Sequence, residues 1–324
     1  SAALVFYGLR ASFTAGSRPF ETGLLMLGLA GYALLLAGTA AGLIRLGQVW
    51  DDVRTILLLV VLMFLAISVS FDYTLVANPD LGRACYLGGL AFAVVVSEWL
   101  LRRIGLRLRA LFRVPYHLIL AVFFVYPLLP AALSDRPGSP ELQWALFGFS
   151  PVAGLVFLTL LPAIRRGPGY VAKNGSPWTW PLYPWVLFGL LAAGVLARSY
   201  WVCISFHFVT HSRSIFGPYV LVPFLLCLAV LLLEIGLSVG RAGVVRLAVV
   251  APSGLLALAL SGHRAEPVYV QFLGLFRETL GGTPAFMTLV ALVAYYLVLT
   301  CRRVPLGAEG LALGLAGFAW ITPG

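Results

Sequence analysis

Ten long apolar runs, separated by short polar segments, constrain this chain more than any other feature of its sequence. A helix of about 20 apolar residues crosses the hydrocarbon of a bilayer while satisfying its own backbone N–H and C=O groups. We therefore predict an all-α integral membrane protein, a polytopic helix bundle of about ten transmembrane helices with short loops. The eighth and tenth runs are short enough to be tilted partners, re-entrant segments or truncated spans instead of full crossings. The runs lie near 22–45, 54–77, 82–101, 114–133, 142–164, 182–206, 215–238, 244–261, 284–301 and 306–322.

Composition excludes a water-soluble globular domain. The 324 residues are 61% hydrophobic and 10% charged, with a mean hydropathy of +0.98, whereas soluble domains carry about 25% charged residues. The net charge of +10 comes from basic residues that stand singly or in short clusters between the apolar runs. There they face lipid headgroups, so we expect the lipid bilayer as partner and no nucleic acid. We also expect no cofactor.

Basic residues are divided unequally between the two sides of the predicted bundle. The loops after the first, third, fifth, seventh and ninth runs carry 14 of the 22 Lys and Arg residues, and the segments on the opposite side carry seven. Cytoplasmic loops are the richer in Lys and Arg, so the N-terminus is predicted on the outer face. The 14 are Arg45, Arg54, Arg102, Arg103, Arg107, Arg109, Arg113, Arg165, Arg166, Lys173, Arg241, Arg246, Arg302 and Arg303.

The preference for Arg over Lys, with abundant Ala, Leu and Gly, is typical of a GC-rich bacterium. We therefore expect a multi-pass protein of the bacterial inner (cytoplasmic) membrane. An outward N-terminus without a signal sequence is unusual, and the apolar stretch 2–9 has the composition of the end of an earlier span. We expect the chain to be a fragment of a longer protein.

A single transmembrane domain is expected over residues 1–324, with two peripheral parts on the outer side. Residues 1–21 form an N-terminal segment, and residues 262–283 form the longest outer loop. Apolar residues recur in this loop at helical spacing, which predicts a short amphipathic helix in the membrane interface. It would serve as an anchor or as a lid over an outer site. The apolar positions are Val268, Phe272, Leu275, Phe276 and Leu280.

Only two charged residues lie five or more residues away from both ends of their apolar run. Asp72 lies about five residues from the outer end of the second run, and Arg198 about eight residues from the outer end of the sixth. At about 1.5 Å per residue both lie roughly 7–12 Å below the outer surface. Charges inside a bilayer are costly, so each is a functional candidate by default. The two residues either pair to fix helix packing or form a binding or gating pair.

Three histidines lie on the same predicted outer side of the bundle as Asp72 and Arg198. His207 and His211 are four residues apart, a spacing that places two imidazoles on one helical face, as in metal-binding helices. No local residue supplies a third ligand, and His263 and Glu266 on the outer loop would supply one only through a contact in the fold. We expect no metal, and we place all three histidines with Asp72 and Arg198 in a hypothetical outer binding site.

The segment 177–185 has the most unusual local composition. Its three prolines prevent a regular helix beyond the first turn. Trp178, Trp180, Tyr183 and Trp185 surround these prolines, and such residues favour the headgroup level. The segment is predicted to be an interfacial anchor or an aromatic site for a lipid, a quinone or a partner helix.

Local pairing rules give partners for two glutamates near the cytoplasmic ends of runs. Glu98 stands four residues before Arg102, which predicts a helical ion pair. Glu234 is expected to reach toward Arg241. Prolines within the runs, such as Pro127, predict kinks whose freed backbone groups need other partners. Further kink positions are Pro130, Pro151, Pro162, Pro218, Pro223 and Pro252.

Catalytic signatures such as GxSxG, a P-loop or HExxH are absent from the sequence. We favour a transporter or permease for a small or amphiphilic solute, which predicts a cavity bounded by the second, sixth and seventh runs. The first alternative is a non-catalytic subunit or scaffold, with other membrane subunits as partners. The second is a membrane enzyme acting on a lipid-linked substrate at the outer face, with Asp72, His207 or His263 as acid–base groups and Arg198 holding a phosphate.

Overall fold

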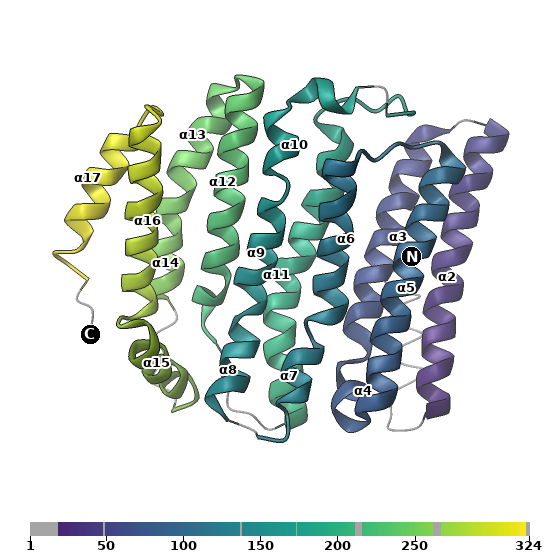
Figure 1. The fold of residues 1–324 in the computed structure, drawn as a ribbon, viewed down its shortest axis with the longest axis horizontal. Helices are drawn as coiled ribbons and strands as arrows, with labels where there is room; N and C mark the ends of the chain where they lie inside the picture. The colour runs from purple at the N-terminus through teal and green to yellow at the C-terminus, as the bar shows by residue number, and fades with distance from the viewer. Residues whose placement is uncertain are drawn as a thin grey trace. The chain divides into compact units, whose positions relative to one another are not determined.

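The computed structural model describes residues 19–47, 49–136, 138–172, 174–210, 216–261 and 267–321, with side chains at all of these except 19–20, 207–210 and 267–270. All regular structure in these residues is helical (Figure 1). Nine helical stretches in this part of the chain are long and apolar enough to cross a membrane. The prediction of a polytopic all-α membrane protein is therefore confirmed.

The tenth apolar run is the exception. It forms only the 11-residue helix α17, Gly307–Gly317, which at about 1.5 Å per residue is too short to cross the hydrocarbon. The other nine runs match the observed spans closely. The spans are Glu21–Gly47, Trp50–Ala77, Pro79–Ile104, Ala110–Ala132, Pro140–Arg165, Leu182–Phe206, Pro218–Val239, Ala242–Leu260 and Pro284–Cys301.

Contacts divide the chain into two compact units. Unit 1 comprises Ser1–Pro137 and Pro168–His211. In it, α3 contacts α2, α5, α6 and α11, so α3 is the central helix of this unit (Figure 1). The helices of unit 1 are α2 (Pro19–Gly47), α3 (Trp50–Ser70), α4 (Asp72–Ala77), α5 (Pro79–Ile104), α6 (Ala110–Val125), α7 (Leu128–Ala132) and α11 (Leu182–Thr210).

Unit 2 comprises Gly138–Gly167 and Ser212–Gly324. Its central helix is α12, which contacts α9, α10, α13 and α14, while α16 contacts α14, α15 and α17. The helices of unit 2 are α8 (Pro140–Phe147), α9 (Phe149–Leu158), α10 (Leu161–Arg165), α12 (Val222–Val239), α13 (Ala242–Val250), α14 (Gly254–Leu260), α15 (Pro267–Leu280), α16 (Pro284–Cys301) and α17.

Three helices begin with the same N-cap arrangement. The side chains of Asn78, Ser139 and Thr283 each accept a hydrogen bond from a backbone N–H three residues on, and each is followed by proline. The cap satisfies an N–H that has no partner within the helix, and proline at the first helical position has no N–H to lose. These short signals fix where α5, α8 and α16 start.

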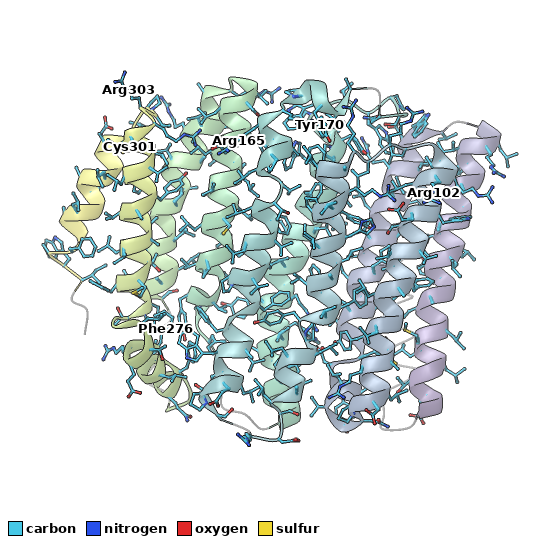
Figure 2. All side chains as sticks on the ribbon, in the orientation of Figure 1. Arg102, Arg165, Tyr170, Phe276, Cys301 and Arg303 are labelled. Carbon is cyan, nitrogen blue, oxygen red and sulfur yellow. The ribbon has the colours of Figure 1, made fainter. Side chains whose placement is uncertain are left out.

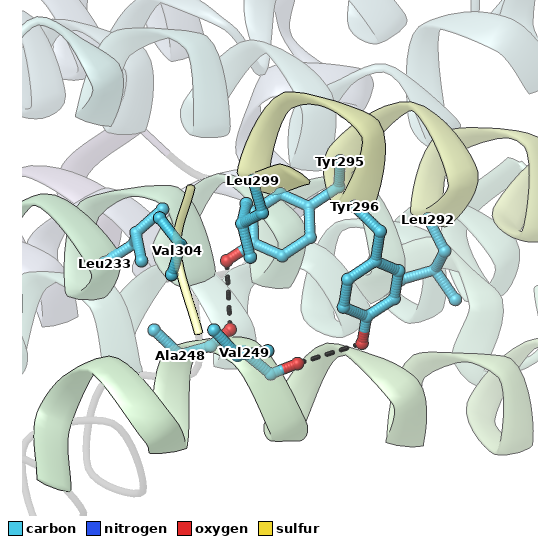
Figure 3. Close-up of a cluster of buried hydrophobic side chains, with 8 residues drawn as sticks. All are labelled: Leu233, Ala248, Val249, Leu292, Tyr295, Tyr296, Leu299 and Val304. Carbon is cyan, nitrogen blue, oxygen red and sulfur yellow. Dashed lines mark hydrogen bonds between the residues drawn. The ribbon is translucent and has the colours of Figure 1, made fainter. Parts of the chain in front are cut away.

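The proline at position 252 breaks the eighth span, as predicted. It lies in a short 3-10 turn between α13 and α14, and it has no N–H to donate to the carbonyl of Ala248. Instead, the hydroxyl of Tyr295 on α16 donates to this carbonyl at 3.0 Å, and the hydroxyl of Tyr296 donates to the carbonyl of Val249 at 2.9 Å (Figure 3). The neighbouring helix thus satisfies the backbone groups that the kink frees.

The predicted amphipathic helix in the loop 262–283 is α15, and it lies across the end of α16 (Figure 1). Phe272 and Phe276 are buried, whereas Arg277 and Glu278 are exposed. The two phenylalanine rings pack against Trp144 of α8 and against further aromatic rings of unit 2. The aromatic face of α15 therefore packs on protein. Whether the helix anchors or covers a site stays a prediction.

Candidate functional site

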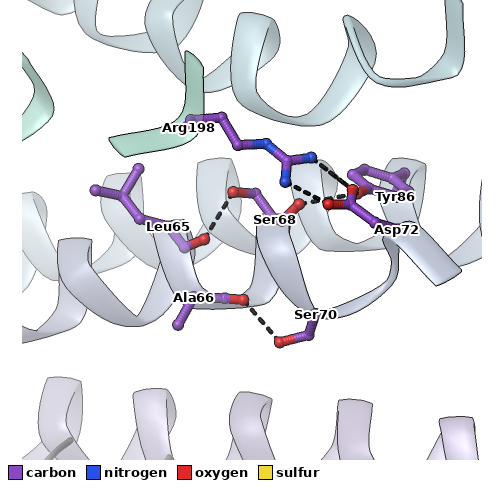
Figure 4. Close-up of polar contacts among 7 residues, drawn as sticks. All are labelled: Leu65, Ala66, Ser68, Ser70, Asp72, Tyr86 and Arg198. Carbon is purple, nitrogen blue, oxygen red and sulfur yellow. Dashed lines mark hydrogen bonds and ion pairs between the residues drawn. The ribbon is translucent and has the colours of Figure 1, made fainter. Parts of the chain in front are cut away.

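The structure brings Asp72 and Arg198 together inside unit 1. Nη1 of Arg198 lies 2.6 Å from Oδ2 of Asp72, and Nη2 lies 2.7 Å from Oδ1 (Figure 4). The side chains are only 1% and 5% exposed. Two parallel charge-assisted hydrogen bonds offset the high cost of removing both charges from water.

Tyr86 of α5 completes this buried group. Its hydroxyl hydrogen-bonds to Asp72, accepts from Nη2 of Arg198 at 3.2 Å, and lies 2.9 Å from the carbonyl of Ser68. Gly82, one turn earlier on α5, allows the approach, because a Cβ there would lie 2.3 Å from the Cα of Leu75 on α4. Sequence reasoning missed Tyr86; the glycine one turn before it was the available signal.

The arrangement of these three side chains suits a structural role. Both terminal nitrogens of Arg198 are engaged by Asp72, and its Nε is buried with no acceptor among the described residues. Neither the guanidinium nor the carboxylate is open to a solute in this conformation. The enzyme hypothesis, in which Arg198 holds a phosphate, gains no support from this geometry.

The three histidines of the hypothetical outer site cannot be added to this group. His207 belongs to α11, but its side chain lies outside the described residues, as do His211 and His263 entirely. In the part of the chain that the structure describes, no three His, Cys, Asp or Glu side chains gather as metal ligands. The expectation of a site without metal or cofactor stays a prediction.

The aromatic segment 177–185 is anchored to protein in unit 1. The ring of Trp178 meets that of Trp50 at 5.4 Å between centroids, and Trp180 meets Trp185 at 5.3 Å. The side-chain amide of Asn174 donates to the carbonyl of Trp178 at 2.9 Å, and the hydroxyl of Tyr183 donates to the carbonyl of Arg107 at 3.2 Å. The segment therefore holds the turn between α5 and α6.

Glu98 does not pair with Arg102, so that prediction is wrong. It pairs with Arg113 of α6, whose Nε lies 2.6 Å from Oε1 of Glu98 and whose Nη2 bonds to Oε2. His117, one turn further along α6, lies 3.4 Å from the same carboxylate. The tight turn between α5 and α6 brings Arg113 into a two-point geometry that the i,i+4 partner on α5 does not match.

Glu234 of α12 also has other partners than predicted. Instead of Arg241, its Oε1 accepts from Arg302, which follows α16, and lies 3.5 Å from Nη2 of Arg165. Figure 2 shows Arg165, Cys301 and Arg303 toward one end of unit 2 and Phe276 toward the other. Glu234 thus ties three segments of unit 2 together at its arginine-bearing end.

An apolar pocket of about 670 Å³ lies between α3, α5, α6 and α11 of unit 1. The transporter hypothesis predicted a cavity bounded by the second, sixth and seventh spans. The second and sixth spans do line this pocket, but the third and fourth spans take the place of the seventh. Exposed Leu182 and Val186 of α11 line it beside buried residues. The mostly apolar lining is typical of small-molecule sites. Its buried apolar residues include Val61, Phe64, Leu100, Leu106 and Leu108.

Few polar groups face this apolar pocket. Arg54 of α3 lines it and has no ion-pair partner among the described residues. Deeper along the helices, Oγ of Ser97 and Oη of Tyr116 hydrogen-bond to each other at 2.7 Å, and Tyr183 of the aromatic segment also contributes. Neither the pocket nor its lining was predicted from the sequence, apart from Tyr183 and the participation of two of the expected spans.

Comparison with known proteins identifies no relative: no family model, no curated protein and no solved structure matches this chain. The structure supports a multi-pass membrane protein. Any more specific function has to be argued from the side chains of the pocket itself.

Proposed function

We propose that this multi-pass membrane protein is a transporter for an amphiphilic solute, whose apolar tail lies in the apolar pocket of unit 1. The single observation that carries the proposal is the pocket itself, which is lined by leucine, valine and aromatic side chains. A tail in this pocket would bury apolar surface, and Arg54 would remain available to a polar end. We expect entry beside Leu182 and Val186, because these lining residues are exposed on α11.

The chemistry of the lining favours binding over catalysis. Among the described residues, no carboxylate and no imidazole lines the apolar pocket. Its hydroxyls belong to Ser97, Tyr116 and Tyr183, and the first two bond to each other. General acid–base and nucleophilic catalysis need a titratable group that can reach the reacting atom; here the hydroxyl of Tyr116 bonds to Ser97 and that of Tyr183 donates to the carbonyl of Arg107.

The helices around the pocket also contain breaks at which they can bend. The second span is interrupted at Phe71, between α3 and α4, and the fourth at Tyr126, between α6 and α7. In α11, Tyr183 has non-helical φ and ψ angles of −111° and 129°. In transporters, discontinuous transmembrane helices typically form the substrate site, and of these breaks the one at Tyr183 lies in the lining of the pocket.

The experiment is a transbilayer movement assay in vesicles that contain the purified protein and a fluorescently tagged alkyl amphiphile. Externally added reductant bleaches the label on the outer leaflet, so the rate of the slow phase reports movement from the inner leaflet. We expect faster movement than in protein-free vesicles. Val186→Trp, which fills the pocket from an exposed position, should slow it about 10-fold, equal to about 1.4 kcal/mol in the barrier.

Ile204→Trp is the matched control, because Ile204 is exposed on the same helix but does not line the pocket. It should leave the rate unchanged. Equal rates in vesicles with and without protein would contradict the proposed function, and so would equal slowing by the two tryptophan variants.

A further inference from the structure

A second pocket of unit 1, of about 790 Å³, lies next to the apolar pocket. Three segments form it: the end of α5, the turn that follows, and the start of α6. The count of basic residues predicts that this end of α5 faces the cytoplasm. Leu101, Leu106 and Leu108 line both pockets. An apolar site and a polar one therefore meet at these three leucines.

The polar pocket carries an excess of positive charge. Arg102, Arg107 and Arg113 line it, and Glu98 is its only acidic residue among the described ones, which leaves two positive charges. Arg113 is held by Glu98. Arg102 and Arg107 are exposed and have no ion-pair partner in the described parts of the chain, so two guanidinium groups are free to bind an anion.

The backbone holds these arginines in place. The amide of Arg107 donates to the carbonyl of Asn174 at 2.7 Å, and its carbonyl accepts from the hydroxyl of Tyr183 at 3.2 Å. Arg102 belongs to the last turn of α5. A turn fixed at both backbone groups of Arg107 holds the backbone from which this side chain extends, so the backbone needs no reordering when an anion binds, a form of preorganisation.

We propose that the polar pocket binds the headgroup of the transported amphiphile, and that this headgroup is a phosphate monoester. A phosphate monoester carries nearly two negative charges at neutral pH and presents three acceptor oxygens, which matches the two uncompensated charges of Arg102 and Arg107. Guanidinium groups bind phosphate oxygens in a two-point geometry. The tail would pass between the three shared leucines into the apolar pocket, so this inference rests on the proposed function.

The test uses the full chain in nanodiscs of zwitterionic phosphatidylcholine, which provides no competing anionic lipid. Equilibrium binding is measured for three radiolabelled probes: a long-chain alkyl phosphate, an alkylphosphocholine of the same chain length, and inorganic phosphate. Arg102→Gln and Arg107→Gln should each weaken binding of the alkyl phosphate about 10-fold, because each removes a charge-assisted contact. Binding of the alkylphosphocholine should change little.

Arg103→Gln is the matched control, since it removes the same charge from the neighbouring position of α5, where Arg103 stacks on Trp99 instead of lining the pocket. It should bind the alkyl phosphate as the unmodified protein does. If Arg102→Gln and Arg107→Gln also bind it as the unmodified protein does, the headgroup site is wrong. If inorganic phosphate binds as tightly as the alkyl phosphate, the site takes free phosphate, and an amphiphile headgroup is excluded.

Val186→Trp separates failure of the headgroup site from failure of the proposed function. This variant should weaken both alkyl probes, because it fills the pocket for the tail. If neither alkyl probe binds the unmodified protein, the amphiphile proposal itself fails. If both bind and respond to Val186→Trp but not to the arginine variants, the amphiphile proposal stands and only the phosphate headgroup is excluded.

Discussion

Arg198 of α11 and Asp72 of α4 join two segments that are 126 residues apart in sequence through a buried two-point ion pair, with N–O distances of 2.6 and 2.7 Å. Tyr86 of α5 shares this group through its hydroxyl. Three helical segments of unit 1 therefore meet at one polar contact inside an apolar bundle. Its removal should first lower the thermal stability of the protein.

Breaking this pair from one side should be severe. Arg198→Ala or Asp72→Ala leaves one buried charge without its partner, and such changes cost about 3–5 kcal/mol. We expect a large drop in the thermal unfolding temperature of the purified protein in detergent, or loss of folded protein. Tyr86→Phe should cost only about 1 kcal/mol, because it removes hydrogen bonds but leaves the two charges paired.

The paired replacement Asp72→Leu with Arg198→Met gives the decisive comparison. Replacing both members of a buried ion pair by apolar side chains of similar size is often neutral, so this double variant should be markedly more stable than either alanine variant. A double variant that is as unstable as the single ones would show that the charges themselves, and not only their mutual compensation, are needed.

The hydroxyl of Tyr295 should stabilise unit 2 more while Pro252 interrupts the eighth span than without this proline. Tyr295→Phe leaves the carbonyl of Ala248 without its donor and should cost about 1 kcal/mol, the upper range for hydrogen bonds in membranes. In a Pro252→Ala background the backbone N–H at 252 can donate to that carbonyl, so the same change should cost less. Unfolding in increasing concentrations of a denaturing detergent measures this double-mutant cycle. Equal costs of Tyr295→Phe in both backgrounds would contradict the idea that its hydroxyl replaces the missing N–H of Pro252.

The Asp72–Arg198 contact was accessible from the sequence, because charges inside a bilayer need partners and these two lie at similar depth. The contribution of Tyr86 was harder to predict: Gly82 one turn before it signals a close helix approach, but a tyrosine within an apolar run has the same sequence pattern whether it packs in a core or faces the headgroups. The spans were predictable for a simpler reason. Bilayer thickness sets the length of a crossing helix, and caps such as Asn78–Pro79 mark where one begins.

Local rules failed where a turn brings a distant residue close. Glu98 has an arginine four residues on, yet it bonds to Arg113 across the turn between α5 and α6, in a two-point geometry. Glu234 likewise bonds to Arg302 from another helix. The two pockets depend on how side chains of several helices fill the space between them, and the periodicity of one helix contains no information about such gaps.

Gly175 should be intolerant of any side chain. Its φ angle is +84°, and a Cβ there would lie 2.1 Å from the carbonyl oxygen of Gly105. Gly175→Ala should therefore combine the strain of a left-handed residue, about 1–2 kcal/mol, with a steric clash of about 1–3 kcal/mol. The expected result is lower thermal stability and weaker alkyl phosphate binding, because the displaced turn carries Arg107.

Gly240→Ala is the control for that change. Gly240 also has a positive φ angle, +68°, but a Cβ there would meet nothing within 4 Å. Gly240→Ala should therefore be destabilised only by the strain of a left-handed alanine, and it should bind the alkyl phosphate as the unmodified protein does. Equal losses of stability in the two variants would mean that the approach of Gly175 to Gly105 is not a tight contact.

Cys301 provides a test of the predicted orientation without any engineered residue. The four cysteines are free, and only Cys301, at the end of α16 beside Arg302 and Arg303, is exposed. The other three lie within apolar spans and are buried or only partly exposed. If arginine-rich loops face the cytoplasm, a membrane-impermeant maleimide should label intact cells poorly and permeabilised cells strongly. Cys301→Ser should abolish the label, and strong labelling of intact cells that Cys301→Ser removes would reverse the assigned orientation.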